Sequence, residues 1–287
     1  MKIRKPSFSA IDTFGRCPRQ YAEGIIRGRG PESKAMLRGT HLHACLEEAA
    51  KHKLDHDCTW REAIDAILEA PPDGILSQPV LEDHLERVFP IVSQLEPSLG
   101  GVELWFDVVG PAADLPELPI CGKIDLISEV ALKVSEQARP YASEEDPCLV
   151  DYKAISNERR IKASYEARRS MQFKIYALAT GIRRAGFVYL TPKDECRAMF
   201  VELTEDDLRI AYRYLTMQLE SMLSCWERFL WPVRPRGSGP LTWGMEVDDI
   251  ENDLEYANWS AWNLSHPDNF LCSSKWCDFH EHCIGKK

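Results

Sequence analysis

Three short apolar segments in the middle of the chain constrain its fold most, because β-branched residues bounded by Gly or Pro are typical of β-strands. They span 102–109, 119–130 and 148–154. Two further segments of this kind lie at 185–192 and 196–203. Helical patterns occupy 9–26, 33–53, 163–182 and 204–229, with two more helices over 60–98 on either side of PPDG. The sequence therefore predicts an α/β fold with a central mixed β-sheet flanked by helices.

The segments between these elements predict loops. Residues 131–147 are charged and contain proline, which is typical of a surface loop. The tail over 231–270 is rich in Pro, Gly, Asp and Trp and has no clean period. No internal repeat is present, so we expect a single domain over 1–287, with its core at about 33–230.

Composition and charge limit the class of protein. An apolar content of 44% with 28% charged residues is ordinary for a soluble globular chain. No run of 18 apolar residues occurs, and the basic start MKIRKPSFSAIDTF has no apolar run behind it, so we expect a cytoplasmic protein without a membrane segment. The net charge of -10 hides a basic segment at 153–187, and a partner meets local charge rather than the total.

Two strand carboxylates raise a chemical question. Asp125 lies within the apolar strand CGKIDLIS, where an ionised acid needs a partner or a cation. In CLVDYKAIS, Asp151 and Lys153 fall on one face of a strand and Tyr152 on the other. If the two strands are neighbours, Asp125 and Asp151 can converge on Mg²⁺ or Mn²⁺, which prefer oxygen ligands. The alternative is a buried ion pair of Lys153 with Asp151 or Asp125.

Several motifs in this order resemble one family. GKID, VDYK and QFKIY resemble the motifs of the PD-(D/E)XK nucleases, in particular their RecB-like exonuclease branch, such as AddB-type and CRISPR-adaptation exonucleases. RGTHLHACLEEA resembles the G-x-x-x-H helix of that branch, and SAIDTFGRCPRQY resembles its N-terminal cysteine segment. The resemblance implies a restriction-endonuclease-like core with a helical and cysteine-rich terminal region.

The resemblance also implies roles for individual residues. His43, Asp125 and Asp151 would bind the catalytic metal, with the Tyr152 carbonyl as a further ligand, and Lys153 would orient or acidify the attacking water. Register with Gly39 favours His43 over His41 as the ligand. Glu47, one turn after His43, could join the metal or lie on the solvated face, and we expect the solvated face.

The helix after Lys153 carries a polar stripe. Arg168, Gln172 and Tyr176 are spaced by four residues, and Arg169 adds a second cation beside them. Such a stripe could hold a phosphate backbone, with Tyr176 offering a stacking surface. The alternative is an ordinary solvated face. We expect DNA contact, because the stripe directly follows the candidate catalytic strand.

Four of the ten cysteines form a separate pattern. Cys272, Cys277 and Cys283 are spaced C-x4-C-x5-C, and Cys17 is a fourth candidate ligand near the start of the chain. The residues alone allow Zn²⁺, with His280 or His282 completing the site, or an iron–sulfur cluster. The resemblance implies a 4Fe-4S cluster that joins Cys17 to the 231–287 segment as a structural staple.

The resulting hypothesis is a metal-dependent DNA exonuclease that hydrolyses phosphodiester bonds in recombination, repair or end processing. The alternative is a DNA-binding or assembly subunit that keeps the fold and has lost catalysis. No G-x-x-x-x-G-K-[ST] motif occurs, so any unwinding needs a partner. A helicase, a recombination protein or a CRISPR-adaptation protein fits that role, in a prokaryotic or phage setting.

Overall fold

The computed structural model describes residues 5–27, 32–110, 116–129, 147–155, 161, 167–191 and 196–228. These form two compact units, one with 5–27, 118–121 and 209–228 and the other with the remaining described residues. The tail over 231–270, most of the 131–147 loop, and Cys272, Cys277 and Cys283 lie outside the described residues. Among the described residues, no helix is long and apolar enough to cross a membrane.

The larger unit is built on a five-stranded mixed sheet. Its strands are β1 (Pro97–Phe106), β2 (Gly122–Ser128), β3 (Cys148–Ala154), β4 (Arg184–Leu190) and β5 (Arg197–Glu202), in the spatial order β1-β2-β3-β4-β5. Only β3 and β4 are parallel, and the other neighbouring pairs are antiparallel. The predicted α/β fold with a mixed sheet flanked by helices is confirmed.

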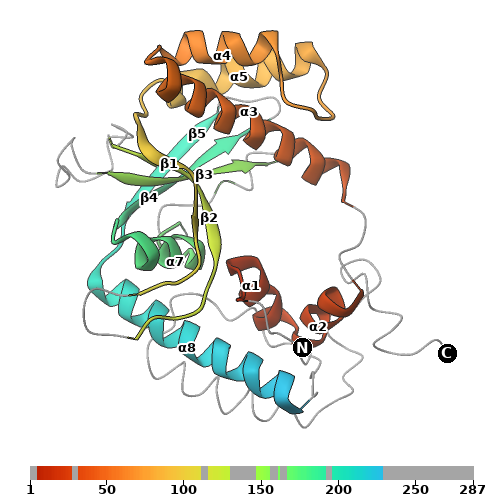
Figure 1. Cartoon of the computed structure of the whole chain (residues 1–287), viewed down its shortest axis with the longest axis vertical. Coiled ribbons are helices and arrows are strands. Elements are labelled where there is room, and N and C mark those ends of the chain that lie inside the picture. Colours follow the sequence, from red (N-terminus) through yellow and green to blue (C-terminus); the bar gives the residue numbers. More distant parts are fainter. Residues whose placement is uncertain are drawn as a thin grey trace. The chain divides into compact units, whose positions relative to one another are not determined.

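Three helices cover one face of this sheet (Figure 1). They are α3 (Lys34–His56), α4 (Trp60–Glu69) and α5 (Gln78–Val92). The Ser33 side chain caps α3, and Thr59 with Glu62 forms a capping box on α4, so local sequence fixes where both helices begin. Their apolar faces and those of β2, β3 and β4 form one buried core, which includes Leu46, Ile64, Leu85, Val150 and Val188.

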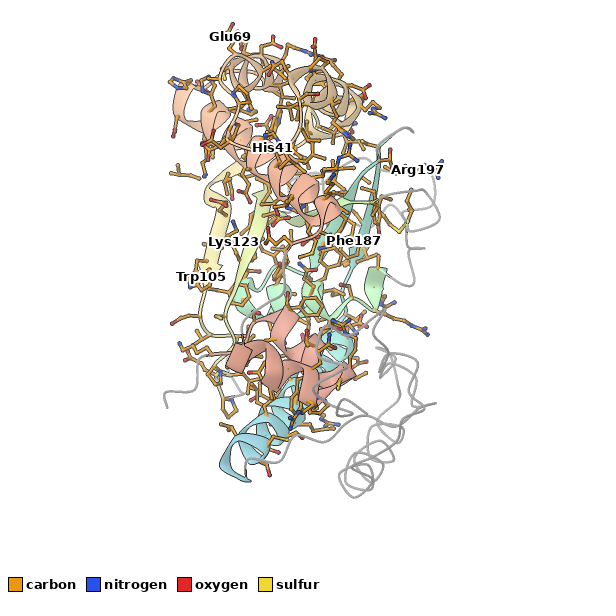
Figure 2. All side chains as sticks on the ribbon, turned by 90° about the vertical axis from the view of Figure 1, so that its right-hand side faces the viewer. His41, Glu69, Trp105, Lys123, Phe187 and Arg197 are labelled. Carbon is orange, nitrogen blue, oxygen red and sulfur yellow. The ribbon has the colours of Figure 1, made fainter. Side chains whose placement is uncertain are left out.

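Helix α7 (Met171–Thr180) packs against β3 and β4. Most of its own residues are buried, which is typical of a helix inside a core. Phe173 packs on Phe187 of β4, with ring centroids 4.2 Å apart. Phe187 is labelled in Figure 2. The predicted helix over 163–182 was too long. Ser170 has an extended backbone at the N-cap of α7, and Gly181, in the left-handed conformation, ends it.

The other unit contains α1 (Phe8–Arg16), α2 (Pro18–Arg27) and most of α8 (Glu205–Arg228). The single helix predicted over 9–26 is wrong, because the helix is interrupted at Cys17. Cys17 has an extended backbone, as expected for a residue before proline, whose ring disfavours the helical conformation there. The Ser7 side chain caps α1 by accepting from the Ala10 N–H.

Candidate metal centre

The end of β3 places two charges on one face. Asp151 is 1% exposed, and Lys153 Nζ lies 2.5 Å from its Oδ2. Tyr152, between them, packs into the core on the α3 side of the sheet. The predicted alternation is confirmed. The ion pair considered from sequence is present too, and Asp151 Oδ2 has no other aligned hydrogen-bond donor among the described residues.

Gln172 of α7 holds this pair in place. Its Nε2 donates to Asp151 Oδ1 and to the Tyr176 hydroxyl, and its Oε1 accepts from Lys153 Nζ at 3.1 Å. The Tyr176 hydroxyl in turn donates to the Lys123 carbonyl at 2.8 Å. One amide therefore orients both charged groups of β3, and a tyrosine orients the amide.

This arrangement gives Tyr176 a different position from the one expected. The sequence suggested a ring available for stacking on DNA, but the side chain is 5% exposed and its hydroxyl is engaged behind the carboxylates. Arg168 precedes α7 and binds Asp207 and Thr204 at the start of α8. The structure therefore does not bring Arg168 together with Gln172 and Tyr176, whereas Arg169 is exposed nearby in the sequence.

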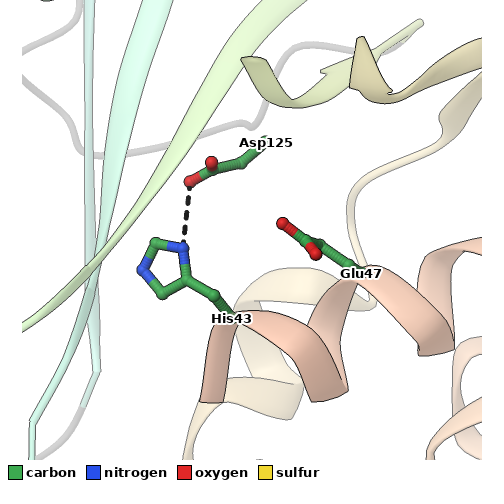
Figure 3. A group of neighbouring side chains, drawn as sticks. All are labelled: His43, Glu47 and Asp125. Carbon is green, nitrogen blue, oxygen red and sulfur yellow. Dashed lines mark ion pairs between the residues drawn. The ribbon is translucent and has the colours of Figure 1, made fainter. Parts of the chain in front are cut away.

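A second group of candidate metal ligands meets at the middle of β2. His43, Glu47 and Asp125 each offer one ligand atom, and these atoms lie within 4.8 Å of one another (Figure 3). His43 Nδ1 is 3.4 Å from Asp125 Oδ2, and the Tyr152 backbone N–H donates to the same oxygen at 2.9 Å. Helix α3, strand β2 and strand β3 thus converge on one carboxylate.

The sheet register brings the two carboxylates towards each other. The pairing of β2 with β3 ends at Leu126 and Val150, and Asp125 and Asp151 are the next residues of the two strands beyond this pair. There the Tyr152 N–H binds the Asp125 side chain. The predicted proximity of Asp125 and Asp151 follows from this register, although their roles as metal ligands stay predictions.

The electrostatics of the group favour a cation. Burial, with repulsion from Asp151, raises the pKa of Asp125 to about 7. Burial also lowers the pKa of His43, which favours the neutral imidazole that binds metals. Burial, with a hydrogen bond to Glu103, raises the pKa of Glu47 to about 8. Without a cation, these buried acids keep protons that a divalent ion would displace.

His41 has a structural place instead. Its buried ring accepts from the Leu76 N–H at Nδ1, 3.1 Å away, and its Nε2 lies 3.0 Å from the Pro72 carbonyl. With Nδ1 as acceptor, Nε2 carries the proton and donates. A side chain at Gly74 would collide with this ring, so the loop between α4 and α5 closes tightly over it. The choice of His43 by register with Gly39 agrees with this placement.

Sequence reasoning missed the surroundings of Glu47. It placed Glu47 on the solvated face, which is wrong, because the residue is 8% exposed and its carboxylate belongs to the ligand group. Lys123 Nζ contacts both Glu47, at 3.4 Å, and Glu103, and Lys51 Nζ donates to Glu103 at 3.1 Å. Glu103 itself has a positive φ of 54°, an uncommon conformation for a non-glycine residue. A charged residue within the apolar strand VELWF was the available signal.

The donor set fits a hard divalent cation. Carboxylate oxygens and a neutral imidazole suit Mg²⁺ or Mn²⁺, and Asp151 Oδ2 adds a buried oxygen that lacks an aligned donor. No thiol belongs to the group. Cys17 is buried at the end of α1, in the other unit, where the Gln20 N–H donates to its sulfur.

Comparison with known proteins identifies the family. The chain matches the model of the PD-(D/E)XK nuclease superfamily over residues 5–283. A candidate exonuclease from Eubacterium rectale is similar at 13% identity and a TM-score of 0.47, covering 86% of this chain and 92% of its own. An alkaline exonuclease from Laribacter hongkongensis is similar at 10% identity and a TM-score of 0.33, covering 66% and 93%. A search of the curated proteins found no match.

The family match spans nearly the whole chain and includes every element that builds the ligand group. The five-stranded mixed sheet flanked by helices is consistent with the restriction-endonuclease-like fold of these nucleases, which use divalent metals. The chain therefore belongs to the PD-(D/E)XK nuclease superfamily.

Proposed function

We propose that this protein is a Mg²⁺- or Mn²⁺-dependent deoxyribonuclease that hydrolyses phosphodiester bonds. One observation carries the proposal. Helix α3 and strand β2, which are far apart in the sequence, bring candidate ligand atoms of His43, Glu47 and Asp125 within 4.8 Å of one another. The Asp151–Lys153 pair lies on β3, the neighbouring strand. A purely structural role rarely explains three buried acids, here Glu47, Asp125 and Asp151, because burying each ionised carboxylate costs several kcal/mol without a cation or a proton.

We assign the metal to His43, Asp125 and Asp151, with Glu47 and the Tyr152 carbonyl completing the shell. A bound divalent ion would lower the pKa of a water molecule and offset charge that develops on the phosphodiester. Lys153 would orient that water, because Asp151 and Gln172 fix its ammonium group beside the carboxylates. Gln172 and Tyr176 would hold these groups in position through hydrogen bonds and would not contact the substrate.

The test is degradation of labelled linear DNA with Mg²⁺, Mn²⁺ or EDTA. Wild type should degrade DNA only with a divalent ion, and Asp125→Asn should lose at least about 100-fold in rate. Asp65→Asn is the matched control, because Asp65 is an exposed acid on α4 away from the ligand group. A wild type that binds DNA yet cuts nothing with either metal would refute the enzyme and favour the catalytically silent subunit.

We further propose that the enzyme acts from DNA ends. The same assay on covalently closed circular DNA separates the two modes, since an exonuclease leaves circles intact while degrading their linearised form. Loss of circles at the linear rate would assign endonuclease action instead. An RNA strand of the same sequence tests the preference for DNA.

The cysteine pattern supports a separate structural proposal. We propose that Cys17, Cys272, Cys277 and Cys283 hold a 4Fe-4S cluster, on the strength of their spacing and the RecB-like motifs. Protein purified without oxygen should be brown with broad visible absorption, and Cys277→Ser should be paler. Colourless protein with one equivalent of zinc would assign Zn²⁺ instead.

A further inference from the structure

An exposed tryptophan lies beside the candidate metal centre. Trp105 belongs to β1, the first strand in the sheet order, and pairs directly across the sheet with Lys123 of β2. Its side chain is 64% exposed, and Figure 2 shows it at the outer margin of the sheet, next to Lys123. Trp60, by contrast, is 3% exposed and donates its indole N–H to the Leu95 carbonyl. Trp105 therefore exposes a large aromatic surface that is not packed in the core.

The backbone at Trp105 is fixed relative to the metal centre. Its neighbour Phe106 lies over Gly122, where a side chain would collide with the phenyl ring. Phe106 also meets the Tyr176 ring edge-to-face, with centroids 5.9 Å apart, and the Tyr176 hydroxyl binds the Lys123 carbonyl. Asp125 follows Lys123 by two residues, about 7 Å along the strand. The tryptophan thus stands at a set distance from the ligand group.

The charges around Trp105 define what it can recognise. Lys123 contacts Glu47 and Glu103, and Lys51 contacts Glu103, so carboxylates already engage both ammonium groups. The surface next to them is therefore poorly suited to attract another phosphate. What it offers is a flat aromatic face, and base–aromatic stacking needs only such a face.

We propose that Trp105 stacks on an unpaired base of the substrate strand, next to the phosphate that the metal centre would cleave. In an intact duplex, neighbouring pairs cover both faces of every internal base and leave open only the outer face of the terminal pair, so next to an internal phosphate only a single strand or a frayed end can present a base face. This inference rests on the proposed nuclease function and adds its substrate class. Trp105 selects unpaired DNA ends over blunt, fully paired ends.

Binding and cleavage together test this assignment. Binding is measured by fluorescence anisotropy of labelled oligonucleotides, single-stranded or blunt duplex, with all proteins in a Lys153→Met background to prevent cutting. Trp105→Ala should weaken single-strand binding about tenfold and duplex binding much less, and Trp105→Phe should restore most of the affinity. Leu99→Ala is the matched control, because Leu99 is a highly exposed apolar residue of the same strand.

The cleavage arm uses proteins with Lys153 intact. Trp105→Ala should slow degradation of single strands about tenfold and leave the melting temperature near that of wild type. If Trp105→Ala binds and cuts single strands like wild type, the inference fails while the nuclease stands. Equal losses on single strand and duplex would also overturn it. A wild type that cuts nothing but binds single strands through Trp105 would overturn the nuclease alone, and one that neither binds nor cuts overturns both.

Discussion

Asp125 combines burial with a second carboxylate as its neighbour. Its Oδ2 accepts from the Tyr152 N–H and lies 3.4 Å from the His43 ring, yet the environment still raises its pKa to about 7. A group in this position destabilises the metal-free fold when ionised. The same group becomes favourable when a divalent cation neutralises it.

The metal-free protein should lose stability as pH rises from about 4 to about 7. In this window folded Asp125 keeps a proton that the unfolded chain has released, so this one group lowers the free energy of unfolding by at most about 1.4 kcal/mol per pH unit. Urea unfolding in EDTA at several pH values measures the slope. Asp125→Asn should flatten it and Asp65→Asn should not, and an unchanged slope in Asp125→Asn would contradict the assignment.

Two of the histidines of α3, His41 and His43, should separate stability from metal binding. His41→Ala loses two partly buried hydrogen bonds and the contact with the loop, so it should cost about 2–4 kcal/mol of folding free energy. His43→Ala should cost less stability but weaken Mn²⁺ binding. Denaturation measures the stability of both variants, and calorimetric titration measures their Mn²⁺ affinity. A folded His41→Ala protein that has lost Mn²⁺ affinity would contradict the structural role assigned to His41.

At this scale the sequence predicted residues within recognisable motifs and missed those outside them. Asp125, Asp151 and Lys153 stand where strand alternation or register places them. Glu47 was misplaced because the direction of a helical side chain depends on which face packs on the sheet. Glu103 was missed because its charge within VELWF does not name its partners, and a glutamate gives no signal of a positive φ.

At the scale of elements, α7 orients the end of β3. Its polar side chain Tyr176 is buried together with its apolar ones, and the half-buried Gln172 binds Asp151, so the helix contributes both to the core and to the candidate site. The parallel pairing of β3 and β4 places α7 between them in the chain. Shifts of this helix would therefore move Asp151 and Lys153.

Gln172→Ala should lower kcat about 10–100-fold with KM little changed, because Gln172 orients Asp151 and Lys153 without touching DNA. Tyr176→Phe, which removes one hydroxyl and keeps the ring, should have a smaller effect of the same kind. Steady-state degradation of linear DNA measures both. A rise in KM alone would instead support the DNA contact that the sequence suggested.

The predicted elements were correct where the local signal was strong. β3 was placed at both ends because an apolar run meets clear borders. The α1–α2 break was missed although Pro18 signals it, since the apolar pattern continues through Cys17. The start of α7 was missed because residues on both sides of Ser170 have similar helical character, and the cap decides between them.

At the scale of the whole molecule, the candidate centre depends on long-range assembly. Its residues come from α3, β1, β2, β3 and α7 of one compact unit, and the helical core behind the sheet sets their distances. Sequence motifs could name many of these residues but could not place Lys123 against Glu47 or expose Trp105. Those relations arise only when the strands pair and curve.

The most direct test of the account is Lys153→Met. Three quantities are measured on one preparation: Mn²⁺ affinity, DNA affinity, and the rate of cleavage of linear DNA, with Lys34→Met as an exposed-lysine control. The account predicts that Lys153→Met keeps both affinities within a few-fold and loses at least about 100-fold in cleavage rate. Unchanged cleavage, or a loss explained by unfolding alone, would contradict it and return Lys153 to the role of an ion-pair strut.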